Sequence, residues 1–363
     1  MNHFGRPLKH YHAQQHTLVL LSTIVTVAAF SSSLVPAASS IIYSGRQRIC
    51  FGNKAFHPLF SQAATASPSN VEEKSDVLVE DSEGAVSTKT SYVLEDGFIF
   101  GLENSGLERP KGKQALLVVE DDSLETKPYQ VAVVASTLTV HALFMIYCIS
   151  AMLQQDSHIY TNSVAALSIL FSSWVLADLG SGIFHWSVDN YGNGKTPILG
   201  SIIAAFQGHH TAPWTITQRG FCNNTYKLCV PFGIPSIVAI SAMSHHNPMI
   251  TLFFASFLTL EVLSQEFHKW SHMTKAQVPQ WVNALQDFGI TVPRTQHALH
   301  HMAPYEGNYC IVSGVCNDIL DKSGFFRRFE KIIYEINVVE SNAWKLDPEL
   351  RSRTLRGEFT PKS

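Results

Sequence analysis

The chain contains little charge and few cysteines. Only 15% of its 363 residues are Asp, Glu, Lys or Arg, while 45% are hydrophobic, a balance between that of a soluble enzyme and that of a polytopic membrane protein. The six cysteines are scattered and form no CxxC pair, which argues against a zinc ribbon or a disulfide scaffold in a chain of this length. We therefore expect reduced thiols, and we expect no nucleic acid among the partners.

Acidic residues are absent from residues 1–71, which are rich in Ser and Ala and carry a few Lys and Arg. This composition is typical of a transit peptide. Within it, the apolar run TLVLLSTIVTVAAF is short for a membrane span and resembles the hydrophobic region of a signal peptide. Together they resemble the two-part presequences of algae whose plastids lie inside additional membranes. We expect a plastid targeting presequence over 1–71; the alternative is a secretory signal or anchor directed to the endoplasmic reticulum membrane.

Residues 72–129 reverse the charge balance. They hold 14 Asp and Glu against 6 Lys and Arg and show no sustained apolar period. This predicts an acidic linker, either flexible or ordered as a cap, without chemistry of its own.

Long apolar runs begin at residue 130. Residues 131–153 and 163–184 are each long enough to cross a hydrocarbon core of about 30 Å as a helix. Residues 228–243 and 248–264 are shorter, and two prolines interrupt the first, so they form either two spans or a hairpin that enters the membrane and returns. We predict an all-α polytopic membrane protein with about four transmembrane helices over residues 130–335, followed by a C-terminal tail over 336–363.

This topology sorts the histidines by side. Successive crossings place His158, His245 and His246 on one side and eight other histidines on the opposite side or at its interface. Neither connection on the three-histidine side, QQDSHIYTN or SHHN, contains Lys or Arg. The positive-inside rule therefore assigns the eight histidines to the cytoplasm-like face, which is the stroma in a plastid.

The eight histidines fall in four clusters: GIFHWSVDNYG, QGHHTAPW, EFHKWSH and QHALHH. Alone, the first also fits an interfacial anchor, since His and Trp are common at membrane boundaries, and the third also fits a polar helix end. The last is the strongest. His297 and His301 lie one helical turn apart, while His300 lies about 100° round the helix from His301, so the three can serve two metal ions. Four clusters on one side favour metal binding.

Ligand type alone does not identify the metal, because imidazole suits zinc, iron and copper. One catalytic zinc takes about three protein ligands and a water, so eight histidines suit two ions better. The chain also lacks HExxH, the pattern of zinc proteases. A pair of irons at a membrane edge suggests O2 activation, which can break an unactivated C–H bond of an acyl chain.

The longer strings carry a resemblance. HxxxH at 268–272 and HxxHH at 297–301 are histidine-box forms of membrane fatty acid desaturases, and ADLGSGIFHWSVDNYG, FQGHHTAPWTIT, FHKWSH and ALQDFGITVPRTQHALHHMAPYEGNYCIVSG resemble the lipid desaturase family over roughly residues 170–325. That family contains plasmanylethanolamine desaturases and the plastid palmitoyl-phosphatidylglycerol trans-3 desaturase. The vinyl-ether branch has a histidine after its ITR segment and two histidines opening the last box. Here Gln218-Arg219 and Gln296-His297 stand instead, which favours the plastid branch.

The resemblance implies a histidine-rich diiron site at one membrane face, with O2 as co-substrate. It further implies a trans double bond at carbon 3 of the palmitoyl chain of phosphatidylglycerol, a ferredoxin-type electron donor, and a thylakoid or inner-envelope location. The implied iron ligands are His185, His209, His210, His268, His272, His297, His300 and His301. Asp178, Asp189 and, more weakly, Asn317 match family positions and are expected to orient ligand imidazoles from behind.

Four cations near the clusters, Arg219, Lys227, Lys269 and Arg294, are candidates for attracting a lipid phosphate; generic membrane anchoring explains them equally well. Other functions stay open at this point: a plasmanylethanolamine-type desaturase forming a vinyl ether, a zinc hydrolase, a non-catalytic scaffold, or a histidine-rich metal-binding protein or transporter. A transporter would hold its ligands at mid-membrane, whereas these histidines lie beyond the ends of the spans.

Overall fold

The computed structural model describes residues 78–80, 86–88, 112–119, 122–154 and 159–360; the predicted presequence lies outside them. Two short strands, β1 (Leu78–Glu80) and β2 (Val86–Thr88), pair antiparallel. All other regular elements among these residues are helical. They are α2 (Pro128–Leu153), α3 (Ile159–Asn190), α4 (Gly200–His209), η3 (Pro213–Gln218), α5 (Phe221–Thr225), η4 (Tyr226–Cys229), α6 (Ile234–Met243), α7 (Pro248–His272), α8 (Gln280–Asp287), α9 (Arg294–His300), α10 (Asn317–Ser323), α11 (Phe325–Asn337), α12 (Asn342–Leu346) and α13 (Pro348–Arg356).

Among the described residues, four segments are long and apolar enough to cross a membrane, as the hydropathy predicts: Pro128–Leu153, Tyr160–Asn190, Phe221–Met243 and Pro248–His272. In each of the first two segments, only 22% of the most apolar 18-residue stretch is buried inside the protein. The corresponding shares in the third and fourth segments are 50% and 44%. The outer faces of α2 and α3 expose side chains such as Leu143, Ile146, Leu167 and Phe171. A hydrocarbon environment suits these faces, since each buried methylene contributes about 0.8 kcal/mol.

The third segment is a broken helix. Its turns are divided among α5, η4 and α6, and the break falls around Pro231 and Gly233. Proline has no N–H to donate and blocks continuation of the preceding turn. At about 1.5 Å per residue, α6 alone covers roughly 15 Å, so this segment matches the thickness of a membrane only with α5 and η4 included.

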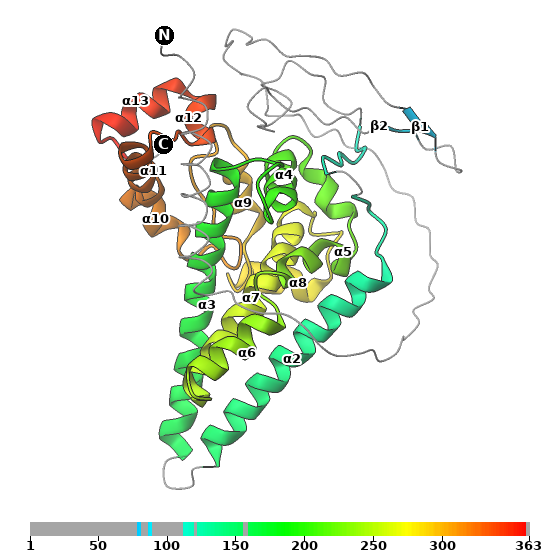
Figure 1. The fold of residues 1–363 in the computed structure, drawn as a ribbon, viewed down its shortest axis with the longest axis vertical. Helices are drawn as coiled ribbons and strands as arrows, with labels where there is room; N and C mark the ends of the chain where they lie inside the picture. Colours follow the sequence, from blue (N-terminus) through cyan, green and yellow to red (C-terminus); the bar gives the residue numbers. More distant parts are fainter. Residues whose placement is uncertain (1–77, 81–85, 89–111, 120–121, 155–158, 361–363) are drawn as a thin grey trace, which may run out of the picture.

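Figure 1 shows how the helices form a wedge. Helices α2 and α3 approach each other at the narrow end and diverge toward the wide end, and α7 packs against both of them. The wide end holds α4, α9 and the C-terminal helices. The turn between α6 and α7, with His245 and His246, lies toward the opposite end. Helix α7 therefore carries its C-terminal histidines into the wide end, beside those of α3.

Helix α12, which falls within the predicted C-terminal tail, packs on the end of α3. The Asn342 side chain donates to the backbone carbonyl of Asp189 (2.7 Å), and the Ala343 N–H donates to the side chain of Asn190 (3.1 Å). Trp344 is buried. Helix α12 thus supports the end of α3, and α13 packs on α11 and α12.

The described residues at the end of the predicted acidic linker lie against the helical domain. Residues 112–119 and 122–127, which we call the strap, run beside α4, η3 and α5. The Leu116 N–H donates to Thr215 Oγ1 (3.0 Å), and the side chains of Trp214 and Gln218 donate to backbone carbonyls of the strap at 2.7 and 2.8 Å. The domain therefore begins before the predicted boundary at residue 130.

Candidate metal centre

All eight predicted histidines lie together at the wide end of the wedge, where they form two groups of potential ligands. Within each group the ligand atoms are all within 4.8 Å of one another. The first, which we call the imidazole group, consists of His209, His268, His272, His297 and His301. The second, which we call the acidic group, consists of His185, Asp189, His210 and His300.

Adjacent histidines contribute to different groups. His297 and His301 belong to the imidazole group, whereas His300 belongs to the acidic group. This division follows from the helix α9, where residues four apart share a face and the next residue points about 100° away. The structure thus divides this cluster between two groups of potential ligands. His209 and His210, at the end of α4, divide in the same way.

The acidic group converges on one carboxylate oxygen. Asp189 Oδ2 lies 3.3 Å from His185 Nε2, 3.1 Å from His210 Nε2 and 3.4 Å from His300 Nε2. All four side chains are buried. Asp189, which the resemblance implies as a residue that orients imidazoles, lies one turn after His185 on α3 and contacts these rings, so its carboxylate is among the potential ligand atoms.

Backbone carbonyls hold two imidazoles of the acidic group from behind. His185 Nδ1 lies 3.0 Å from the Tyr309 carbonyl oxygen, and His300 Nδ1 lies 2.9 Å from that of Gly307. A carbonyl only accepts, so each Nδ1 carries the proton and each Nε2 presents a lone pair. This is the usual arrangement behind a metal-bound histidine. The sequence gives no sign of these partners, because every residue has a backbone carbonyl.

In the imidazole group, ring nitrogens approach one another directly. His272 Nε2 lies 2.9 Å from the Nε2 atoms of both His209 and His297, and His301 Nε2 lies 3.1 Å from His297 Nε2. Each nitrogen has one proton or one lone pair, so these three contacts cannot all be good hydrogen bonds. A shared cation accounts for them: imidazole nitrogens bind at about 2.0–2.1 Å, which places ligands at right angles about 3 Å apart.

The ionisation states also fit a metal. Burial keeps the pKa of His209, His297 and His301 well below the usual value, and the neighbouring imidazoles lower it further. These side chains are therefore neutral at pH 7, the form that binds a metal. In addition, neither ring nitrogen of the buried His268 has a hydrogen-bond partner among the described residues. Such an atom is costly unless something else satisfies it, and a metal ion does so.

Asp178 and Asn317 have structural partners other than imidazoles. Asp178 Oδ1 accepts from the N–H groups of residues 313 and 314 (both 2.7 Å), and its Oδ2 accepts from that of residue 316 (2.9 Å). Asn317 bonds both backbone groups of Cys310, at 2.8 and 3.2 Å. The hydrogen bonds of both side chains described here go to backbone groups of one loop. They fix the loop after Tyr309, whose carbonyl holds His185.

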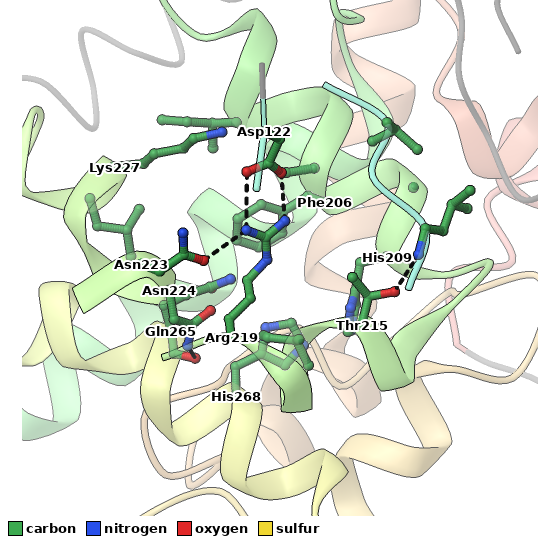
Figure 2. Close-up of a pocket in the computed structure, with 17 residues that line it drawn as sticks. Asp122, Phe206, His209, Thr215, Arg219, Asn223, Asn224, Lys227, Gln265 and His268 are labelled. Atoms are coloured by element: carbon green, nitrogen blue, oxygen red, sulfur yellow. Dashed lines mark hydrogen bonds and ion pairs between the residues drawn. The ribbon is translucent and has the colours of Figure 1, made fainter. Parts of the chain in front are cut away.

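A pocket borders the imidazole group (Figure 2). It is partly open to solvent and spans about 750 Å³ of empty space, the solvent at its mouth included, and His209 and His268 line it together with Arg219 and Lys227. Two of the four predicted headgroup cations therefore lie on one cavity with the histidines. Lys269 does not: it is buried and paired with Glu266 at 3.0 Å. Arg294, at the start of α9, is not among the residues that line this pocket.

Arg219 already holds a carboxylate that the sequence analysis missed. Its guanidinium contacts Asp122 with two bonds, Nη2 to Oδ2 at 2.5 Å and Nη1 to Oδ1 at 3.1 Å. Figure 2 shows the pair at the pocket, with Lys227 reaching toward it. Asp122 stands in an acid-rich stretch, EDDSLE, and nothing in the pattern separates it from its acidic neighbours.

Comparisons with known proteins agree on one family. Residues 174–344 match the model of the lipid desaturase domain. "Fatty acid desaturase 4-like 1, chloroplastic" from Arabidopsis thaliana is 39% identical over 67% of this chain and 80% of its own length. "Fatty acid desaturase 4, chloroplastic" from the same plant is 44% identical over 52% of this chain and 57% of its own length. Plasmanylethanolamine desaturase 1 of Mus musculus is 34% identical over 44% of this chain and 61% of its own length. No solved structure matches the chain.

Proposed function

Because the chain belongs to the lipid desaturase family and is thus an oxidoreductase acting on lipids, we propose that it introduces a trans double bond between carbons 3 and 4 of palmitoyl chains in phosphatidylglycerol. In this reaction the acyl chain loses two hydrogens, and O2, two electrons and two protons yield two molecules of water. The observation that carries the proposal is the pair of ligand groups at one end of four candidate spans. The chloroplastic relatives support the choice of branch and a plastid membrane.

We assign one iron ion to each ligand group. The acidic group supplies three imidazoles and the Asp189 carboxylate, and the imidazole group supplies five imidazoles. Iron held there would supply the O2 activation that breaks an unactivated C–H bond. In the acidic group, the carbonyls of Gly307 and Tyr309 keep the protons on Nδ1, so that Nε2 stays available.

The remaining residues of the site exclude water and admit substrate. Phe206 packs against the rings of His185 (centroids 5.2 Å apart) and His268 (6.2 Å), and Tyr309 packs against His300 (4.9 Å). The pocket reaches the imidazole group at His209 and His268. Carbon 3 is only two bonds from the carbonyl carbon of the ester and therefore lies close to the headgroup. A site at the ends of the spans, beside a cationic pocket, suits that substrate. A ferredoxin-type protein in the stroma is the proposed electron donor.

The test is the lipid profile of a plastid-type host that lacks this activity, after expression of the chain. We expect trans-3-hexadecenoyl groups in phosphatidylglycerol with the intact chain and none with His272→Ala. Lys275→Gln, which changes an exposed residue paired with Asp287, is the matched control and should leave the product unchanged. Acid-labile vinyl-ether lipid in place of the trans-3 product would contradict the proposal and assign the chain to the plasmanylethanolamine-type reaction.

A further inference from the structure

The described residues that line the pocket beside the imidazole group carry an excess of positive charge. Among its lining residues, Arg219 and Lys227 are cationic, Asp122 is anionic and the two histidines belong to the ligand group. Lys227 makes no ion pair with a described residue. Apolar side chains such as Ile202, Phe206 and Leu228 form other parts of the wall. The lining therefore suits a molecule with an anionic end and an apolar remainder.

Arg219 is positioned to hold an anion. Besides its two bonds to Asp122, its Nη1 lies 2.9 Å from Asn223 Oδ1 and 3.3 Å from the Ser123 carbonyl oxygen. Such contacts fix the plane of the guanidinium, whose fork binds a carboxylate or a phosphate equally well. Burial alone would raise the pKa of Asp122, but the hydrogen bond and charge of Arg219 outweigh it and lower that pKa. At neutral pH an ionised carboxylate thus occupies the fork.

The strap stays in place without the Asp122 side chain. Asn223 Nδ2 donates to the carbonyls of Ser123 (2.9 Å) and Glu125 (3.2 Å), and Thr215 accepts from the Leu116 N–H. The strap also packs closely on α4: a Cβ built on Gly208 would lie 2.8 Å from both Cγ atoms of Val118. The Asp122 carboxylate can therefore leave Arg219 by rotation of one side chain, while the backbone of the strap remains as a wall.

We propose that Arg219 and Lys227 bind the phosphate diester of an anionic phospholipid, and that Asp122 occupies that position until the lipid displaces it. This inference rests on the proposed function, because it places the headgroup of the same substrate. A lipid with one negative charge competes against Asp122, whereas a zwitterionic lipid carries a cation that Arg219 and Lys227 repel. Asp122 would thus set both the affinity for the lipid and the preference for anionic headgroups.

The test measures binding to the full chain in detergent micelles by isothermal titration. The probes are dioctanoyl phosphatidylglycerol, dioctanoyl phosphatidylcholine and inorganic phosphate. We expect Arg219→Gln to weaken phosphatidylglycerol binding about ten-fold, as expected for the loss of one charge-assisted contact. Asp122→Asn should strengthen that binding by a similar factor. The double variant should bind like Arg219→Gln alone, because Asp122 acts through that guanidinium.

Three comparisons make the test decisive. Lys275→Gln should leave all affinities unchanged. Weaker phosphatidylglycerol binding by Asp122→Asn, or an equal change for phosphatidylcholine, would show that Asp122 only anchors the strap and would overturn the proposal. Inorganic phosphate that binds as tightly as phosphatidylglycerol would identify a free-phosphate site and also overturn it. Two checks separate these results from misfolding. One is the thermal unfolding of each variant. The other is the variant Arg219→Lys, which keeps the positive charge but loses the fork of the guanidinium.

The outcome is separable from that of the proposed function. Affinities that shift as expected in a chain that forms no trans-3 double bond would support the headgroup site and contradict the reaction. A trans-3 product formed with the same KM for phosphatidylglycerol in wild type, Arg219→Gln and Asp122→Asn would support the reaction and contradict the headgroup site.

Discussion

The acidic group and the imidazole group differ in their surroundings. All four side chains of the acidic group are buried, and backbone carbonyls hold His185 and His300 from behind. In the imidazole group, three of the five histidines are partly exposed, and two members line the pocket. We infer that the acidic group forms the more rigid and shielded position, while the imidazole group faces the pocket.

Charge reinforces this difference. In the acidic group Asp189 offsets part of the charge of a divalent ion, whereas five neutral imidazoles offset none. An ion in the acidic group is therefore easier to keep in a buried environment, where an uncompensated charge is costly. An ion in the imidazole group retains more of its positive charge beside the pocket.

Asp189→Asn tests the acidic group most directly. We expect at least a roughly 100-fold loss of desaturation, since even residues behind metal ligands contribute 10- to 100-fold, and the iron content should fall from about two ions per chain toward one. Metal analysis and product analysis measure both effects. Asp287→Asn, an exposed carboxylate paired with Lys275, is the control. Full activity with two bound irons would remove Asp189 from the ligand set.

His185→Ala and His301→Ala compare the two groups with each other. The first removes one of four ligands and the second one of five. We expect His185→Ala to lose an iron during dialysis against a chelator. His301→Ala should retain more of its iron but desaturate slowly. The same iron loss in both variants would show that the groups do not differ in metal retention.

Asp178→Asn should act on the acidic group indirectly. Asp178 accepts three backbone hydrogen bonds from the loop after Tyr309, and bonds to a charged acceptor are worth about 1.5–3 kcal/mol each. The amide keeps one accepting oxygen, so we expect a loss of roughly 3 kcal/mol of stability and a lower melting temperature. Iron retention should fall with it. An unchanged melting temperature would mean that the loop is held by other contacts.

A pH effect of smaller size is expected at Asp321. Burial raises the pKa of this carboxyl to about 6. The hydrogen bond that the Asn308 N–H donates to it acts in the opposite direction. The folded chain therefore holds this proton more tightly than the unfolded chain does, so its stabilising effect is lost as the pH rises through that value. Relative to Asp321→Asn, wild type should lose about 1 kcal/mol between about pH 5 and pH 7. A difference in the free energy of unfolding between the two proteins that stays constant from about pH 5 to pH 7 would contradict the raised pKa.

Much of the fold could be predicted from the chain because its signals are local. Apolar run length marked the spans, and the helical period divided His297 and His301 from His300. The broken third span was visible only as two alternatives, since prolines mark an interruption but not the path around it. The ordered strap and the packing of α12 on α3 were not predictable, because each depends on partners about 90 to 150 residues away in sequence.

The site shows the same division. Residue type and spacing along the chain were sufficient to identify all eight histidines and the end of the molecule on which they gather, because imidazole chemistry and helix geometry do not depend on distant partners. The place of Asp189 among the ligands, the loop held by Asp178, and the Asp122–Arg219 pair depended on long-range packing. A carboxylate acts as ligand, clamp or ion-pair partner according to what lies within about 3 Å of it, and those neighbours come together only when the chain folds.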